Sequence, residues 1–379
     1  MIAVIAVAVL TVLIVQHLPS SSQRSEHRHR VANHVAGSPL VIRPARPDGI
    51  PGPTARWAAD SRLPVGGSRP AWLYPAKGRM TPIGGLPPLR SGYEFTRIIG
   101  GWAVQAGAGA GPWCSGCAAG PMPVYFLADK ARSARIVGIA NRVAPAAEPE
   151  AVWLTTYPAS PQRASERGGA GFAQEFSASG EPLGPRVRLP GGYVIDTATG
   201  RGLLLSRIIP RAPEPTYELW DPGTRHVTRT FSSVIAASAS QIAWTPECAT
   251  RCQVRVLDVR IGRTTQIALR SGSAARGAFS PDGSLLALAV SIGNGGDGGS
   301  TAMQLEVASV PGGRLAVVPG TWASSDALSG FGWPAGDDSL VAELSFMTKV
   351  QVASWHPGSS RLAVAVVAQR QKPNDLVVG

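Results

Sequence analysis

Residues Phe279-Ser280-Pro281-Asp282-Gly283-Ser284-Leu285-Leu286-Ala287 combine an aromatic residue, a turn with proline and glycine, and an apolar run. An aromatic residue in similar surroundings returns about every 46 residues along the chain, a period typical of repeat folds. The other members are Trp102, Trp153, Tyr193, Trp244 and Trp333. Repetition at this period predicts a β-propeller, in which each repeat forms one four-stranded blade.

A second repeated feature, a pair of Val-, Ile- and Leu-rich runs around a tight turn, predicts a series of β-hairpins. One hairpin lies between successive aromatic residues, so each repeat supplies four strands. The predicted turns are at Tyr74-Pro75, Asp129, Ser179, Asp221-Pro222-Gly223, Asp258, Pro311-Gly312-Gly313 and His356-Pro357-Gly358.

The fold class is therefore all-β, with seven blades expected and six as the alternative. The first hairpin, Trp72 to Leu86, has no predicted strand pair before it. We expect the last apolar segment, Leu376-Val377-Val378, to pair beside this hairpin and close the ring, which would remove open sheet edges. Little helix is expected beyond the N-terminus, because no later segment keeps a 3.6-residue apolar period.

The stretch Phe279 to Ala287 resembles the repeat of TolB-like and WD40-like propellers, where such a turn links the first two strands of a blade. Trp333 to Ala342 is a looser copy, and Trp244-Thr245-Pro246-Glu247 is looser again. Leu219-Trp220-Asp221 and Val256-Leu257-Asp258 resemble the end of the third strand in these repeats. The resemblance implies a propeller fold and carries no catalytic residue with it.

The chain divides into three predicted parts: a membrane anchor or signal segment at 1–18, a linker at 19–70 and the propeller at 71–379. Ile2 to Val15 is apolar except for Thr11, and at about 14 residues it is closer to the core of an export signal than to a full membrane span. We expect export with a retained anchor, which would place the propeller on the extracytoplasmic side of the cell membrane. A secreted protein is the alternative, and a buried core segment is a third interpretation. The linker is rich in Ser, Pro, Arg and Gly, so it has little apolar surface to bury.

Four cysteines form two pairs, Cys114/Cys117 and Cys248/Cys252. Each pair lies after a repeat aromatic, in the predicted loop between the second and third strands of its blade. In an exported protein this spacing favours two local disulfides. A zinc site and a redox-active C-x-x-C are the competing interpretations, but the pairs differ in spacing and no βαβ pattern surrounds Cys114.

Motifs for catalysis are largely missing from the sequence. No G-x-S-x-G motif occurs, which excludes a fused serine hydrolase of that type. His226 and His356 fall in or beside hairpin turns, and Asp282 and Asp337-Asp338 fall in repeat turns, where structural roles are expected. Asn294 to Asp297 resembles an insertion more than a calcium loop. We therefore predict no catalytic, cofactor-binding or metal-binding residue.

The net charge of +12 could favour an anionic membrane or wall polymer, and nucleic acid is not expected for an exported protein. The basic excess is concentrated in the linker and in Arg186, Arg188, Arg201, Arg207 and Arg211. Two functions remain for a monomeric propeller. One is a non-catalytic scaffold that binds a protein, peptide or cell-wall ligand. The other is an enzyme of lyase or lactonase type in the propeller channel, which needs charged residues on the inner strands. These strands look mainly small and apolar, which favours the scaffold.

Overall fold

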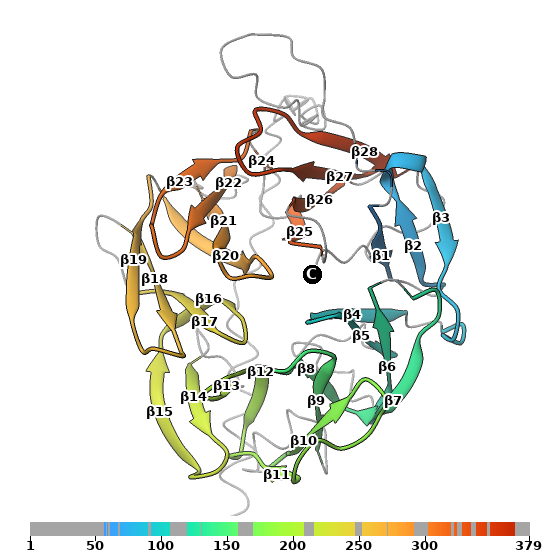
Figure 1. The fold of residues 1–379 in the computed structure, drawn as a ribbon, viewed down its shortest axis with the longest axis vertical. Helices are drawn as coiled ribbons and strands as arrows, with labels where there is room; N and C mark the ends of the chain where they lie inside the picture. The colour runs from blue at the N-terminus through green and yellow to red at the C-terminus, as the bar shows by residue number, and fades with distance from the viewer. Residues whose placement is uncertain are drawn as a thin grey trace, which may run out of the picture. The chain divides into compact units, whose positions relative to one another are not determined.

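The computed structural model describes residues 57, 59, 61–66, 69–89, 92–106, 120–129, 131–157, 170–207, 216–246, 252–270, 272–291, 302–319, 322–323, 328–334, 339–346 and 349–367. Within these residues the chain forms seven antiparallel sheets that follow one another in sequence order. They are the seven blades of an all-β propeller, in agreement with the expected fold (Figure 1). The predicted anchor at 1–18 and residues 368–379 lie outside the described residues.

The first three blades run from blue to green in Figure 1. Blade 1 contains β1 (Leu63–Val65), β2 (Ala71–Tyr74) and β3 (Arg79–Pro82), and a short 3₁₀ turn, η2 (Pro75–Lys77), joins the last two. Blade 2 contains β4 (Tyr93–Ile98), β5 (Gly101–Ala106), β6 (Met122–Ala128) and β7 (Arg135–Ala140). Blade 3 contains β8 (Arg142–Pro145), β9 (Ala151–Thr156), β10 (Phe172–Ser177) and β11 (Val187–Arg188).

The next two blades repeat this four-stranded order. Blade 4 contains β12 (Tyr193–Thr199), β13 (Gly202–Arg207), β14 (Tyr217–Asp221) and β15 (His226–Phe231). Blade 5 contains β16 (Ser233–Ala237), β17 (Gln241–Thr245), β18 (Gln253–Asp258) and β19 (Thr264–Ala268).

The last two blades complete the series. Blade 6 contains β20 (Ser273–Phe279), β21 (Leu285–Ser291), β22 (Ala302–Ser309) and β23 (Leu315–Val317), and β24 (Trp322–Ala323) also pairs with β22. Blade 7 contains β25 (Leu328–Gly332), β26 (Leu340–Phe346), β27 (Lys349–Trp355) and β28 (Ala363–Val367). In blades 2 to 7 the first strand lies toward the middle of Figure 1 and the fourth toward the rim.

All seven predicted hairpins are present, each joining the last two strands of its blade's main order. Local hydrogen bonds explain why these turns could be read from sequence. The Asp258 carboxylate, for example, accepts the backbone N–H of Arg260 at 2.9 Å. In the Ser-Pro-Asp-Gly turn between β20 and β21, the Ser280 hydroxyl donates to Asp282 at 2.6 Å, and Gly283 takes a φ of 72°, which glycine adopts without a Cβ penalty. Asp282 therefore has the expected structural role.

The main hydrophobic clusters lie between neighbouring blades. Trp102 and Leu127 of blade 2 pack with Trp72 of blade 1, and comparable clusters join each following pair of blades. A further cluster joins Leu63 and Leu73 of blade 1 to Val341 and Val352 of blade 7. Because apolar side chains are buried between the first blade and the last, the ring is held closed by packing.

The aromatic residues that revealed the repeat are not equivalent to one another, contrary to the sequence-based expectation. Trp102, Trp153 and Trp244 lie on second strands, whereas Phe279 ends a first strand and Trp333 follows one. Tyr193 instead begins a first strand. The turn after Trp244 consequently follows a second strand, so it is not a copy of the turn after Phe279. A large aromatic side chain can fill the space between blades from either strand. For this reason the aromatic residues recur at about one per blade although their strands differ.

Blade 1 begins earlier than expected. β1 (Leu63–Val65) lies inside the range 19–70 that was assigned to a linker, and it pairs with β2 from Leu63↔Leu73 to Val65↔Ala71. The strand directly beside the first hairpin is therefore β1. Leu376-Val377-Val378 lies outside the described residues, so its pairing stays a prediction.

Candidate functional site

The two cysteine pairs lie where the sequence placed them, between the second and third strands of blades 2 and 5. Cys252 is disulfide-bonded, and its partner is outside the described residues, as are Cys114, Cys117 and Cys248. The pairing within each loop stays a prediction.

The other residues singled out from sequence are scattered. His226 begins β15 and His356 follows β27, and both are exposed turn residues. Arg201 directly precedes β13 and Arg207 ends it, so these two arginines lie at opposite ends of that strand. Asp337-Asp338, Asn294 to Asp297 and Arg211 lie outside the described residues.

A different set of polar residues comes together on the innermost strands of blades 2, 3 and 4. The first strand of blade 3, β8, contacts β4 of blade 2 on one side and β12 of blade 4 on the other. Glu94 on β4, Arg142 on β8 and Asp196 on β12 form this group, which we name the axial cluster. Glu94 and Asp196 are exposed and Arg142 is partly buried.

A β-bulge presents Asp196. The pairing of β12 with β13 shifts between Ile195 and Thr197, which leaves Asp196 as the extra residue. Bulges redirect side chains and are common beside functional sites. The first strands of blades 5, 6 and 7 carry equivalent shifts, where the extra residues are Ile235, Ala275 and Ser329. Among these four positions only blade 4 supplies a charge.

Tyrosine side chains border the cluster. The Tyr157 hydroxyl donates to the Tyr193 carbonyl at 3.1 Å, and the Tyr193 hydroxyl donates to Glu218 at 2.7 Å. The backbone N–H of Tyr157 donates to the Asn141 side chain at 2.9 Å, which ties the end of β9 to the start of β8. The bond from Tyr157 to Tyr193 thus joins blade 3 to blade 4, and the other two bonds hold these tyrosines within their own blades.

The electrostatics of the cluster follow from two carboxylates near one cation. Protein atoms crowd the Asp196 carboxyl although solvent reaches it, and this desolvation raises its pKa from 3.8 to about 6. A hydrogen bond from Ser206 and the charge of Arg142 lower that pKa in part. Desolvation also raises the pKa of Glu94, again opposed by Arg142. Arg142 is thus the cation that acts on both carboxylates.

Asp196 in turn affects its aromatic neighbours. Burial raises the pKa of Tyr217 to about 12, with a further contribution from the charge of Asp196. The pKa of Tyr157 is raised by burial and by Asp196 and is lowered by Arg142. Both phenols therefore stay protonated at neutral pH and can donate hydrogen bonds.

The inner strands carry mainly small and apolar residues, as expected from the sequence, and the axial cluster is a charged exception that was not predicted. A signal was present in the sequence: Glu94 interrupts Tyr93 and Phe95, and Asp196 follows Val194-Ile195 in a segment with no other charged residue. A charged residue at such a position needs a partner or solvent. Which blades meet could not be read from that signal.

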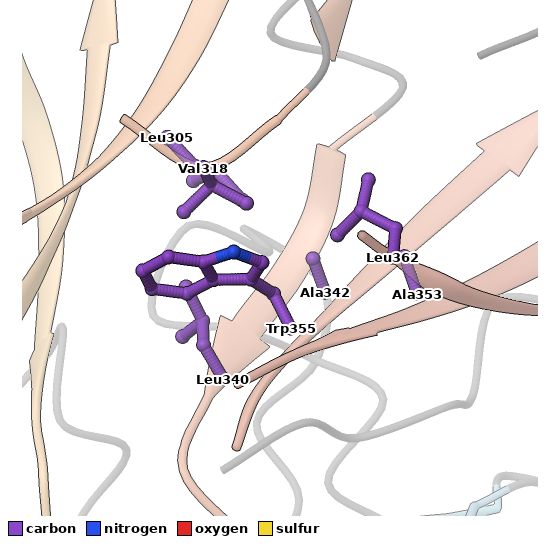
Figure 2. A pocket seen from close by; sticks show the side chains of 7 residues that line it. All are labelled: Leu305, Val318, Leu340, Ala342, Ala353, Trp355 and Leu362. Atoms are coloured by element: carbon purple, nitrogen blue, oxygen red, sulfur yellow. The ribbon is translucent and has the colours of Figure 1, made fainter. Parts of the chain in front are cut away.

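An apolar space lies between blades 6 and 7, where Trp355 meets the six side chains shown with it in Figure 2. The lining consists of Leu305, Val318, Leu340, Ala342, Ala353, Trp355 and Leu362. All seven belong to one buried core cluster. We assign this space to packing between blades.

Within the described ranges, no group of three or more His, Cys, Asp or Glu side chains is placed to hold a metal ion. The same residues include no helix with the length and apolar character to cross a membrane.

No protein-family model matches the chain, and no curated protein matches it. Solved structures do match. TolB from Acinetobacter baumannii is 14% identical, with 72% of this chain and 65% of that chain covered and a TM-score of 0.38. An acylaminoacyl peptidase is 12% identical, with 79% and 48% covered and a TM-score of 0.49. A puromycin-hydrolyzing peptidase from Mycobacterium tuberculosis is 12% identical, with 85% and 57% covered and a TM-score of 0.46.

The chain thus spans less than two thirds of the length of these three proteins. TolB proteins are among the matching structures. The class of protein is established by the chain's own seven sheets.

Proposed function

We propose that this protein is a non-catalytic, extracytoplasmic, membrane-anchored propeller that binds a protein or peptide ligand at the axial cluster. The observation that carries the proposal is the convergence of exposed Glu94 and Asp196 with Arg142 on three neighbouring inner strands. Charged groups at such a place can fix the orientation of a ligand that the surrounding tyrosines contact. The apolar segment at 1–18 and the disulfide-bonded Cys252 support the extracytoplasmic placement.

The test uses a photoreactive amino acid at either end of β13 in intact cells. Arg207 is the last residue of β13, on the strand that carries Ser206 beside Asp196, whereas Arg201 lies in the turn before the strand. The proposal expects a crosslinked partner from position 207 and not from position 201. Capture should be lost when Glu94→Gln and Asp196→Asn are combined. Crosslinking only from position 201 would contradict the proposed site. Crosslinking from position 207 that is equally strong in the double variant would also contradict it.

A second function is favoured by the pKa of Asp196, which at about 6 lies in the range for a general acid or base near neutral pH. This observation supports the alternative of a lyase or lactonase. Purified protein would be incubated with polyuronate and lactone panels, and product formation would be followed for the wild type and Asp196→Asn. Turnover that disappears in Asp196→Asn would replace the scaffold proposal with an enzyme.

A further inference from the structure

The axial cluster has an imbalance of charge that indicates what it binds. Arg142 lies on β8, which contacts both β4, the strand of Glu94, and β12, the strand of Asp196. Its charge acts on both carboxylates. When all three groups are ionised, their sum is one negative charge. Both carboxylates are exposed, so a ligand can reach them. The surrounding protein disfavours their ionised forms in part, and a partner of opposite sign stabilises those forms.

We infer that the axial cluster binds a cationic group of a peptide, an amine or a guanidinium, through the carboxylates of Glu94 and Asp196, whose strands β4 and β12 both contact β8. This inference rests on the proposed function and adds the chemical class of the ligand. The incoming cation would supply the second positive charge that balances the two carboxylates. Tyr193 and Tyr217 of blade 4 are partly exposed, so their rings can pack against the methylene groups of a Lys or Arg side chain.

The charge of the whole chain has the opposite effect on peptide binding. The net charge of +12 attracts acidic peptides and repels basic ones. A basic peptide that binds at this site would therefore do so against the repulsion from the net positive charge. Ser206 and Arg142 act on Asp196, and Asp196 in turn acts on Tyr157 and Tyr217. Protonation of Asp196 removes its charge. Binding of a cation should consequently weaken as the pH falls through about 6.

The experiment measures binding of two fluorescent pentapeptides, Gly-Lys-Gly-Lys-Gly and Gly-Glu-Gly-Glu-Gly, to the full-length chain by fluorescence anisotropy. The lysine peptide is expected to bind with saturation and the glutamate peptide more weakly. Asp196→Asn and Glu94→Gln should each weaken the lysine peptide about tenfold, as expected for the loss of one charge-assisted contact. Arg142→Gln should strengthen it, because a competing cation is removed.

Glu181→Gln is the matched control, since it removes one exposed carboxylate from the turn between β10 and β11 and should leave binding unchanged. Tighter binding of the glutamate peptide that is lost in Arg142→Gln would overturn the inference and assign an anionic ligand. Absence of binding by both peptides would also overturn it. If crosslinking from position 207 still depends on Glu94 and Asp196, the ligand class alone is wrong. If that dependence is missing as well, the proposed site fails.

Discussion

The indole Nε1 of Trp333 donates a hydrogen bond to the carbonyl oxygen of Ala278 at 3.1 Å, and this bond joins blade 7 to blade 6. Trp333 is also buried in the cluster between these blades. A Trp333→Phe variant should lose about 1–3 kcal/mol of unfolding free energy, because it removes this hydrogen bond and part of the buried ring. Chemical denaturation would measure the loss.

Trp355→Phe is the comparison, since the Trp355 indole donates to Ser359 within the same blade at 2.7 Å. Hydrogen exchange should increase on both blades 6 and 7 in Trp333→Phe. An unchanged denaturation midpoint in Trp333→Phe would show that the bond between the blades contributes nothing.

Leu305 contributes to the apolar contact between blades 6 and 7 (Figure 2). Its side chain is fully buried, so Leu305→Ala should destabilise the protein by about 2–5 kcal/mol through lost contacts and a new cavity. Thermal and urea unfolding would measure the effect. Ile261→Ala is the control, because Ile261 is 69% exposed and its truncation should change stability by about 0.5 kcal/mol or less. Equal effects of the two variants would contradict the assignment of this space to packing.

Glu306 on β22 is fully buried, and neither carboxylate oxygen has a hydrogen-bond partner among the described residues. Burial raises its pKa above the ordinary 4.5, and Arg270 partly opposes this. Between pH 4.5 and the raised value, the folded state binds more protons than the unfolded state, so the Glu306 contribution to stability falls as pH rises. Glu306→Gln should therefore raise the melting temperature at about pH 8 and change it little at about pH 4.

The control for Glu306 is Glu181→Gln, which removes an exposed carboxylate and should not show this pH dependence. A Glu306→Gln variant that is less stable than the wild type at neutral pH would mean that the ionised carboxylate stabilises the fold.

The C-terminal segment is predicted to add a fourth strand to blade 1. Blade 1 has three strands among the described residues, whereas each of the other blades has at least four. If Leu376-Val377-Val378 pairs with blade 1, replacing these three residues by serine should lower the melting temperature. Replacing Gln369, Gln371 and Lys372 by serine serves as the control of equal length. Equal melting temperatures for both variants and the wild type would contradict closure by the C-terminal segment.

The hairpins were predictable because a tight turn depends on residues that are neighbours in the chain. Asp221-Pro222-Gly223 and Pro311-Gly312-Gly313 carry their turn preference locally, and both turns lie between the predicted strands. The all-β class and the seven blades followed from the spacing of these turns. The exact strand of each aromatic did not, because a tryptophan on a first or second strand can fill the same kind of space between blades.

The amino-acid sequence by itself determined the repeat and the turns, and it favoured seven blades over six. Only the tertiary structure decided that Glu94, Arg142 and Asp196 belong together, because they come from three blades and meet only when β4, β8 and β12 lie side by side. The bulge at Asp196 is likewise a matter of how β12 pairs with β13, which residue order does not specify. Local chemistry sets turns, whereas packing between distant strands sets which charges share one environment.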